Sequence, residues 1–210
     1  MVLRFTERLG TSGNDSLTAS FNTITFGLAG NDVISATSNQ DFMVAVGGSG
    51  NDTYVLANNS ALTIIDAGGG TDTLIASGIG LFSNTSFSYT IDSRHLLAFD
   101  TLSGQAFYGL DWLSSNNKVE FIELADGRFS FDFIASNLNS LGNVSWEFLG
   151  ALGFQSLITA EVNEAITFYS ARQELLEIVT TPAGDAINQI YLNVLRREAD
   201  PAGLGFWVAQ

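Results

Sequence analysis

The sequence predicts an N-terminal half rich in β-structure and an α-helical C-terminal domain. Three observations lead to this fold class. A motif containing glycine and aspartate recurs over residues 10–76, polar and apolar residues alternate over 79–133, and apolar residues then recur every three to four positions. These patterns divide the chain into repeats over 1–78, further strands over 79–135 and a helical domain over 136–210.

Composition indicates a folded, acidic protein. The chain has 210 residues, with 22 acidic and 8 basic side chains, a formal net charge of −14 and 46% hydrophobic residues. This apolar content is enough to bury a core. A surface this negative repels nucleic acid and anionic lipid, so cations are the expected partners. No apolar run reaches the length of a membrane span.

The chain lacks the residues that several catalytic mechanisms require. Cysteine is absent and His95 is the single histidine, which excludes thiol catalysis and zinc sites built from several histidines. The sequence contains no G-x-S-x-G elbow, and no lysine follows the glycine clusters as it does in a phosphate-binding loop. We therefore expect His95 at the surface or at a sheet edge, and we expect the protein not to be an enzyme.

Four copies of one motif occupy the N-terminal third. Each copy has two small residues, a glycine, a polar residue and an aspartate, with an apolar residue two positions later. Glycine permits positive φ and the aspartate adds a carboxylate, so each turn offers hard oxygen ligands. The copies are 17 to 20 residues apart, which fits two short strands and two turns, so the motifs should stack on one edge of a coil. The aspartates are Asp15, Asp32, Asp52 and Asp72, and the inward-pointing apolar residues should be Leu17, Ile34, Tyr54 and Leu74.

This motif resembles the GGxGxDxUx nonapeptide repeats of the RTX, or hemolysin-type, calcium-binding proteins. The resemblance implies a right-handed parallel β-roll, a form of β-solenoid, with Ca²⁺ between stacked turns. It also implies a second row of turns near residues 22, 41 and 60, where only Asp41 supplies an aspartate. We therefore expect calcium mainly along the first edge. The metal-binding residues implied are Gly13, Asp15, Gly30, Asn31, Asp32, Gly48, Gly50, Asn51, Asp52, Gly68, Gly70 and Asp72.

Electrostatics favours an ion between the turns. Neighbouring strands are about 4.8 Å apart, and two carboxylates at that separation repel by roughly 3 kcal/mol at an effective dielectric constant near 20. A divalent cation between them converts this repulsion into attraction. Folding should therefore depend on calcium.

The middle of the chain should continue or cap the coil. Turn signals at Ser103-Gly104, Asn116-Asn117 and Asp126-Gly127 separate four to six expected strands. The segment KVEFIELADGRFSFD, residues 118–132, resembles a VExxxFADG stretch that often follows such repeats in secreted bacterial proteins. Four acids in this segment are candidates for a further calcium site, although we favour a solvated strand face. They are Glu120, Glu123, Asp126 and Asp132.

The last part of the chain has helical periodicity. Thr159 is a suitable N-cap for a helix that ends before Pro182, and Asp200-Pro201 has the form of a later helix start. The segment INQIYLNVLRREADPAGLGFWV resembles the DUF4214 helical module of secreted bacterial proteins, which would begin at about residue 183. We expect this module to be incomplete at Gln210. That family implies a cellular context but no chemistry.

These features together predict a secreted calcium-binding structural protein of the bacterial cell surface. The RTX resemblance implies type I secretion and folding outside the cell. The open ends of a roll favour self-association into a surface layer, filament, matrix or adhesin, and a surface polysaccharide is a second candidate partner. One alternative is a secretion and folding module of a larger exoprotein or exoenzyme. A minor alternative is an ice- or glycan-binding adhesin.

Overall fold

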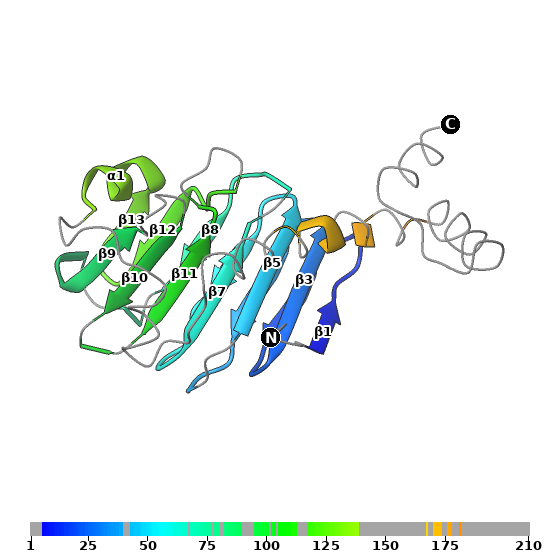
Figure 1. The fold of residues 1–210 in the computed structure, drawn as a ribbon, viewed down its shortest axis with the longest axis horizontal. Helices are drawn as coiled ribbons and strands as arrows, with labels where there is room; N and C mark the ends of the chain where they lie inside the picture. Colours follow the sequence, from blue (N-terminus) through cyan, green and yellow to red (C-terminus); the bar gives the residue numbers. More distant parts are fainter. Residues whose placement is uncertain are drawn as a thin grey trace.

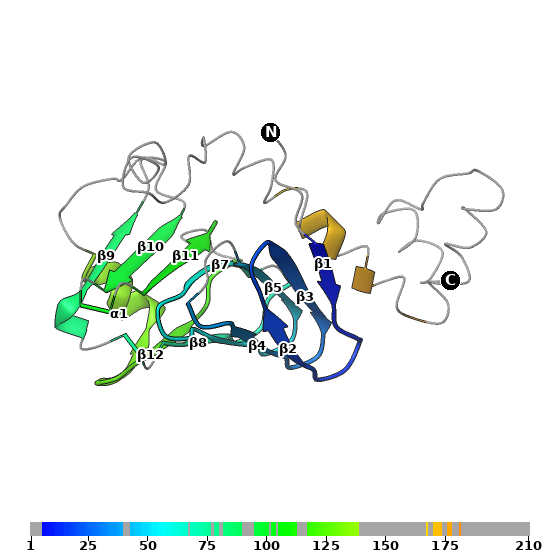
Figure 2. The same ribbon diagram turned by 90° about the horizontal axis from the view of Figure 1, so that it is seen from below.

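The chain forms two β-sheets that face each other across a hydrophobic core (Figure 1). From residue 6 to residue 75 successive strands alternate between the sheets, so each coil there adds one strand to each of them (Figure 2). The computed structural model describes residues 6–39, 43–66, 68–76, 78–79, 82–89, 95–100, 102–103, 105–112, 117–138, 167, 170–173, 176–177 and 181.

Among the residues described above, sheet A has seven strands and sheet B has six. In spatial order, sheet A consists of β1 (Thr6–Leu9), β3 (Thr23–Ala29), β5 (Met43–Ser49), β7 (Ala61–Ile65), β11 (Ala106–Leu110), β10 (Leu96–Asp100) and β9 (Thr85–Tyr89). Sheet B consists of β13 (Gly127–Ser130), β12 (Phe121–Leu124), β8 (Thr73–Ile75), β6 (Thr53–Val55), β4 (Val33–Ala36) and β2 (Ser16–Ala19).

The strands of the repeat region all pair in parallel. In sheet A, β1, β3, β5 and β7 are parallel neighbours, and β2, β4, β6 and β8 are parallel neighbours in sheet B. This arrangement is a parallel β-solenoid, which confirms the predicted coiled β-structure and is consistent with a β-roll. Parallel stacking of equivalent strands follows directly from the near-constant spacing of the motif.

The apolar residue after each motif aspartate points into the core, as predicted. Register pairs Leu17 with Ile34, Ile34 with Tyr54 and Tyr54 with Leu74, so these side chains form one row across sheet B. The last three are fully buried, and Leu17 at the end of the row is partly buried. Full burial of one such side chain contributes about 1.5–3 kcal/mol to folding.

The two sheets are buried to different extents. Strands of sheet B alternate between buried and more exposed residues, whereas β3 and β5 are buried on both faces. In β5, Met43 and Ala45 belong to the interior core cluster, while Val44 and Val46 point the other way and are also buried. Continuous apolar runs such as MVAV are typical of strands covered on both sides.

The edge opposite the motifs is built from asparagine. Turns occur at 21–22, 38–39 and 58–59, close to the second row of turns expected near 22, 41 and 60. Their second residues, Asn22, Asn39 and Asn59, have φ values of 56°, 57° and 53°. Asparagine is the residue other than glycine that adopts this left-handed conformation most readily, so it replaces the glycine of the resembled repeats.

We expect Asn59→Ala to lower the free energy of unfolding by about 1 kcal/mol, because alanine is strained at positive φ. Asn59→Gly should have little effect, since glycine adopts this conformation freely and loses only the bond from Asn59 Nδ2 to Asn39 Oδ1. Urea unfolding of both variants measures the difference. Equal stabilities of the two variants would contradict the conformational explanation.

In the described part of the chain, five strands follow the repeats, within the predicted four to six. Strand β11 pairs in parallel with β7, and β12 with β8, so these two strands continue the solenoid. Beyond them the pairing becomes antiparallel. In sheet A, β10 pairs with β11 and β9, and in sheet B, β13 pairs with β12. The 3-10 helix η1 (Phe82–Asn84) precedes β9.

The alternating pattern that extends to residue 133 predicts a strand there, but β13 ends at Ser130. Helix α1 (Phe131–Ser136) begins there instead, because Ser130 is its N-cap and its hydroxyl accepts a hydrogen bond from Phe133 N–H at 3.3 Å. Asp132 lies in the first turn, where its charge favours the helix. The alternating aromatic residues of this segment favoured a strand, and the N-cap signal of Ser130 alone was too weak to predict a helix.

The structure does not support a helical domain over 136–210. After residue 138 it describes only 167, 170–173, 176–177 and 181, of which all but 181 have helical backbone. The segment that resembles DUF4214 lies outside the described residues. No helix in the described part of the chain is both long and apolar enough to cross a bilayer.

The expectation of a surface or edge position for His95 was wrong. Its side chain is fully buried, and Nδ1 accepts a hydrogen bond from Asp111 N–H at 2.8 Å. This bond ties the start of β10 to the turn after β11, a long-range contact that sequence spacing does not reveal.

Candidate metal centre

The motif aspartates form a hydrogen-bonded ladder along one edge of the solenoid. Asp32 Oδ1 accepts from Asp15 N–H at 2.8 Å, and Asp52 Oδ1 accepts from Asp32 N–H at 2.9 Å. Asp72 Oδ1 accepts from Asp52 N–H at 2.7 Å. Glu120 then extends the row, since its Oε2 accepts from Asp72 N–H at 2.8 Å. Each carboxylate is therefore oriented by the backbone of the preceding turn.

Asparagine forms a second ladder on the outside of the same edge. Asn14 Oδ1 accepts from Asn31 N–H, Asn31 Oδ1 from Asn51 N–H, and Asn51 Oδ1 from Thr71 N–H, each at 2.8 Å. These residues are exposed. The side-chain oxygens of Asn31 and Asn51 are thus engaged in stacking the turns, and the metal role of these two residues stays a prediction.

The second oxygen of two ladder carboxylates lacks a partner. Oδ2 of Asp32 and Oδ2 of Asp52 are buried without a hydrogen bond, and each residue is only 1% exposed. A Cβ on Gly27 would overlap the Gly47 carbonyl oxygen and lie 2.5 Å from Asp32 Oδ2. The Gly47 carbonyl oxygen and Asp32 Oδ2 therefore lie on the same side of Gly27, both close to its backbone. Buried charges with no partner are costly, so this edge fits a cation.

Three buried aspartates form the most compact acidic cluster. One carboxylate oxygen from each of Asp52, Asp66 and Asp72 lies within 4.8 Å of the others, and each residue is 2% exposed or less. Tyr54 Oη donates a hydrogen bond to Asp66 Oδ1 at 2.9 Å. This aspartate triad can hold a metal ion, and its hard oxygen donors suit an ion of the calcium or magnesium type.

The environment raises the pKa of these acids above their ordinary value of 3.8. Burial raises the pKa of Asp32 to about 6 and that of Asp52 to about 7. Burial, together with the charge of Asp72, raises the pKa of Asp66 to about 9. Burial also raises the pKa of Asp72, although its hydrogen bonds oppose the shift. None of the described basic side chains lowers these pKa values, so near neutral pH a cation would have to supply the positive charge that stabilises the ionised carboxylates.

We expect the cation-free protein to become less stable as pH rises from about 4 to about 9. Over this range the folded chain binds more protons than the unfolded chain, because the folded pKa values are the higher ones, so the free energy of unfolding falls with pH. A bound cation requires deprotonated ligands, so it should reverse this slope. Urea unfolding at pH 5 and pH 8, with chelator and with Ca²⁺, measures both slopes. A cation-free protein that is more stable at pH 8 would contradict the assignment.

The glycines of the later turns behave as predicted and that of the first does not. Gly30, Gly50 and Gly70 have φ values of 121°, 130° and 155°, and Gly48 and Gly68 also have positive φ. Gly13 is not among the positive-φ glycines. A Cβ on each later glycine would meet the carbonyl group of the turn before it, whereas a Cβ on Gly13 would lie 3.8 Å from Thr11 Oγ1 and touch nothing closer.

The first turn also holds its aspartate differently. Asp15 Oδ2 accepts from the Thr11 N–H at 2.6 Å and from the Thr11 hydroxyl at 2.9 Å. Asp15 is partly buried and its carboxylate is satisfied locally. Among the predicted metal residues, the structure therefore brings Asp52 and Asp72 together in the triad, places Asp32 beside them in the ladder, and leaves Asp15 at the end.

Two residues of the site, Tyr54 and Asp66, were not predicted as metal-site residues, and Glu120, a candidate for a separate calcium site, extends this one. Asp66 lies six positions before Asp72, where the other copies have Leu9, Phe26 and Val46. A lone acid in an otherwise apolar column was the available signal. Glu120 is half-buried and continues the ladder, so the expectation of a solvated strand face was wrong for it.

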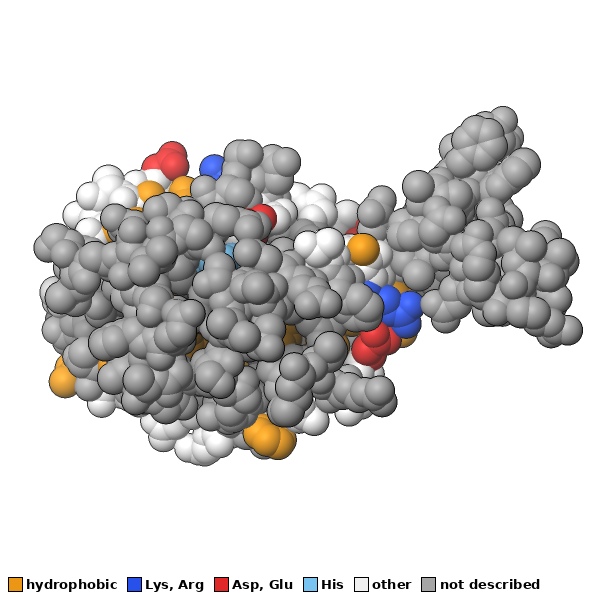
Figure 3. Space-filling view, viewed as in Figure 1, with side chains coloured by type: hydrophobic (Ala, Val, Ile, Leu, Met, Phe, Trp, Pro, Cys, Tyr) orange, Lys and Arg blue, Asp and Glu red, His pale blue; other side chains and the backbone are white. Residues whose placement is uncertain are grey.

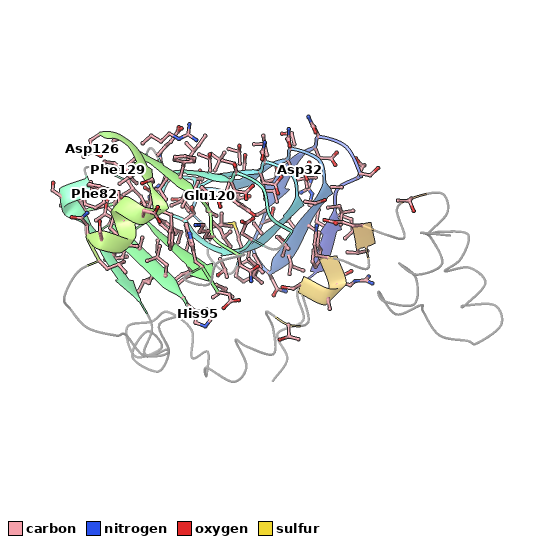
Figure 4. All side chains as sticks on the ribbon, turned by 90° about the horizontal axis from the view of Figure 1, so that it is seen from above. Asp32, Phe82, His95, Glu120, Asp126 and Phe129 are labelled. Atoms are coloured by element: carbon pink, nitrogen blue, oxygen red, sulfur yellow. The ribbon has the colours of Figure 1, made fainter. Side chains whose placement is uncertain are left out.

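The other acids of that segment lie at the surface. Asp126 is exposed, and its Oδ2 accepts a hydrogen bond from Phe82 N–H at 2.9 Å. Glu123 Oε1 lies 3.7 Å from Arg128 Nε. Figure 4 shows Asp126 beside Phe82 and Phe129, far along the solenoid from Asp32. On the face seen in Figure 3, charged side chains of the described residues are scattered rather than gathered into a patch.

Comparison with known proteins finds no family model and no curated protein that matches the chain. The fold and the site together define a parallel β-solenoid whose stacked acidic turns include a buried aspartate triad able to hold a metal ion.

Proposed function

We propose that the protein is a calcium-binding structural protein whose solenoid is stabilised by Ca²⁺ between the motif turns. The observation that carries this proposal is the row of buried carboxylates with unpartnered oxygens, Asp32 Oδ2 and Asp52 Oδ2, next to the aspartate triad. In water-free surroundings these charges favour unfolding unless a cation neutralises them.

Calcium fits these donors better than other common divalent ions. It accepts carboxylate and backbone carbonyl oxygens in flexible geometry, whereas Mg²⁺ retains several waters and demands near-octahedral geometry. Zn²⁺ favours the nitrogen and sulfur ligands that are absent from this edge. Asp32 and Asp52 would bind with glycine carbonyls such as that of Gly47, and the triad would bind through Asp52, Asp66 and Asp72. The ion would supply positive charge and hold adjacent turns together.

Calcium dependence also supports a role outside the cell. A chain that folds only weakly without Ca²⁺ would stay export-competent in calcium-poor cytoplasm and fold in calcium-rich surroundings, as the RTX resemblance implies. We therefore propose secretion to the bacterial cell surface and a structural rather than catalytic role there. The regular ladder of backbone-held carboxylates supports ion binding along the coil more than chemistry on a substrate.

Self-association is the structural role that we propose. Strand β1 is the end strand of sheet A and pairs only with β3 among the described strands, and β2 is the end strand of sheet B. End strands of this kind can pair with another copy of the chain. Short length and the charged residues Glu7 and Arg8 would keep such pairing weak, so we expect assembly only when calcium has ordered the coil.

Analytical ultracentrifugation of the full chain, with Ca²⁺ and with chelator, tests the proposal. We expect assemblies in Ca²⁺ and monomers in chelator. Calorimetric binding of Ca²⁺ by a chain that remains monomeric would contradict self-association and favour the alternative, a folding module of a larger exoprotein. Absence of calcium binding would contradict the proposed function as a whole.

A further inference from the structure

A short C-terminal segment lies across the first three strands of sheet A. Its described residues, 170–173 and 176–177, are here called the strap, and Figure 1 shows them beside β1 and β3. Gln173 and Leu176 of the strap are buried. Its polar side chains reach three neighbouring strands: Arg172 Nη2 lies 3.0 Å from Glu7 Oε2, Gln173 Nε2 donates to the Leu28 carbonyl oxygen at 3.1 Å, and Glu177 Oε1 accepts from Ser49 N–H at 3.0 Å.

The strap contacts one of the motif turns of the solenoid. Ser49 belongs to the third copy of the motif, between Gly48 and Gly50. A Cβ on Gly48 would overlap Gln173 Nε2 and lie 2.8 Å from Glu177 Oε1. Gly48, predicted as a metal-site glycine, therefore also leaves the room that the strap occupies.

Docking places a negative charge beside the ladder. Burial is the main cause of the raised pKa of Asp32 and of Asp52, and the charge of Glu177 adds to it in both cases. Oδ2 of each aspartate is buried without a hydrogen-bond partner. Without a cation, Glu177 is thus held by the Ser49 N–H and by Gln173 Nε2 while two buried carboxylates repel it.

We propose that docking of the strap is coupled to cation binding at the motif edge, so that Ca²⁺ there fastens the C-terminal part of the chain to the solenoid. This inference rests on the proposed function, because it needs an ion near Asp32 and Asp52. Glu177 acts through its charge, and it is not part of the triad. The coupling is reciprocal: an ion that favours docking must bind more tightly when the strap is docked.

Hydrogen–deuterium exchange of the full chain during a Ca²⁺ titration tests the coupling. Peptides from β5 report the roll, and peptides spanning 170–177 report the strap. In the wild type we expect strap protection to rise roughly fivefold with Ca²⁺ beyond any change in β5. In Glu177→Gln the amide oxygen can still accept both hydrogen bonds but carries no charge. Strap protection in this variant should already be high in chelator and should change little with Ca²⁺.

Arg172→Gln is the second variant, because it loosens the strap without changing the charge beside the ladder. We expect weaker strap protection and, by reciprocity, Ca²⁺ affinity lowered by up to roughly fivefold in calorimetry. Identical Ca²⁺ responses in wild type and Glu177→Gln, or unchanged affinity in a loosened Arg172→Gln, would overturn the coupling while Ca²⁺ binding stands. No heat of binding and no response of β5 would instead overturn the proposed function itself.

Discussion

Asp52→Asn is expected to have opposite effects on stability with and without calcium. In Ca²⁺ it removes a carboxylate shared by the ladder and the triad, so most of the calcium-induced stabilisation should be lost. In chelator at pH 8 it removes a buried charge, so the free energy of unfolding should increase. Burial raises the pKa of Asp52 to about 7 from 3.8, which makes its ionisation unfavourable by roughly 3 kcal/mol once screening by solvent is allowed for. Asparagine keeps an acceptor for Asp32 N–H but makes a weaker bond, so we expect a net gain of about 2 kcal/mol.

Urea unfolding in Ca²⁺ and in chelator measures both effects. Asp126→Asn is the matched control, because Asp126 is exposed, lies outside the ladder and accepts a single backbone bond from Phe82. This control should change stability by less than about 0.5 kcal/mol in either condition. Asp52→Asn variants that are destabilised equally in both conditions would show that the carboxylate has a structural role without a cation.

Gly50→Ala is expected to disrupt the solenoid whether or not calcium is present. The φ of Gly50 is 130°, and a Cβ there would overlap the Gly30 carbonyl oxygen of the preceding turn. The backbones of Gly50 and Gly30 cannot move apart without separating the two turns, because hydrogen bonds between the turns hold them together. We expect a loss of more than about 4 kcal/mol, or failure to fold, measured by far-ultraviolet circular dichroism and urea unfolding.

The motif supplies its own control for this substitution. Gly13 occupies the same motif position as Gly50 but is not among the positive-φ glycines, and its Cβ would meet only Thr11 Oγ1 at 3.8 Å. Gly13→Ala should therefore leave stability within about 1 kcal/mol of the wild type. If the two variants were equally stable, close backbone approach between turns would not be what requires glycine.

Local repetition made much of the solenoid predictable. The spacing of the motif aspartates and the inward apolar row from Leu17 to Leu74 depend only on neighbouring coils being alike, and the structure has both. The asparagine turns were also visible, because Asn22, Asn39 and Asn59 repeat at the same 17- and 20-residue intervals as the aspartates. The resembled repeats have glycine and aspartate at such turns, so the resemblance did not predict asparagine there.

The remaining features of the fold and site depend on contacts between residues far apart in the sequence, which the motif spacing does not predict. Asp66 and Tyr54 meet because two coils are stacked, and nothing in the motif links them. Alternation over 79–133 predicted strands but not their direction, since β11 pairs in parallel with β7 on one side and antiparallel with β10 on the other. The bond from Asp111 to buried His95 and the contacts of Glu177 with β5 join distant residues for the same reason.

Thermal unfolding of the full chain in chelator and in saturating Ca²⁺ tests the central claim most directly. If stacked acidic turns bind the ion only in the folded state, a calcium concentration far above the dissociation constant should stabilise the protein by several kcal/mol. For a chain of 210 residues this corresponds to a rise in melting temperature of roughly 10 °C. The same melting temperature in both solutions would contradict the account.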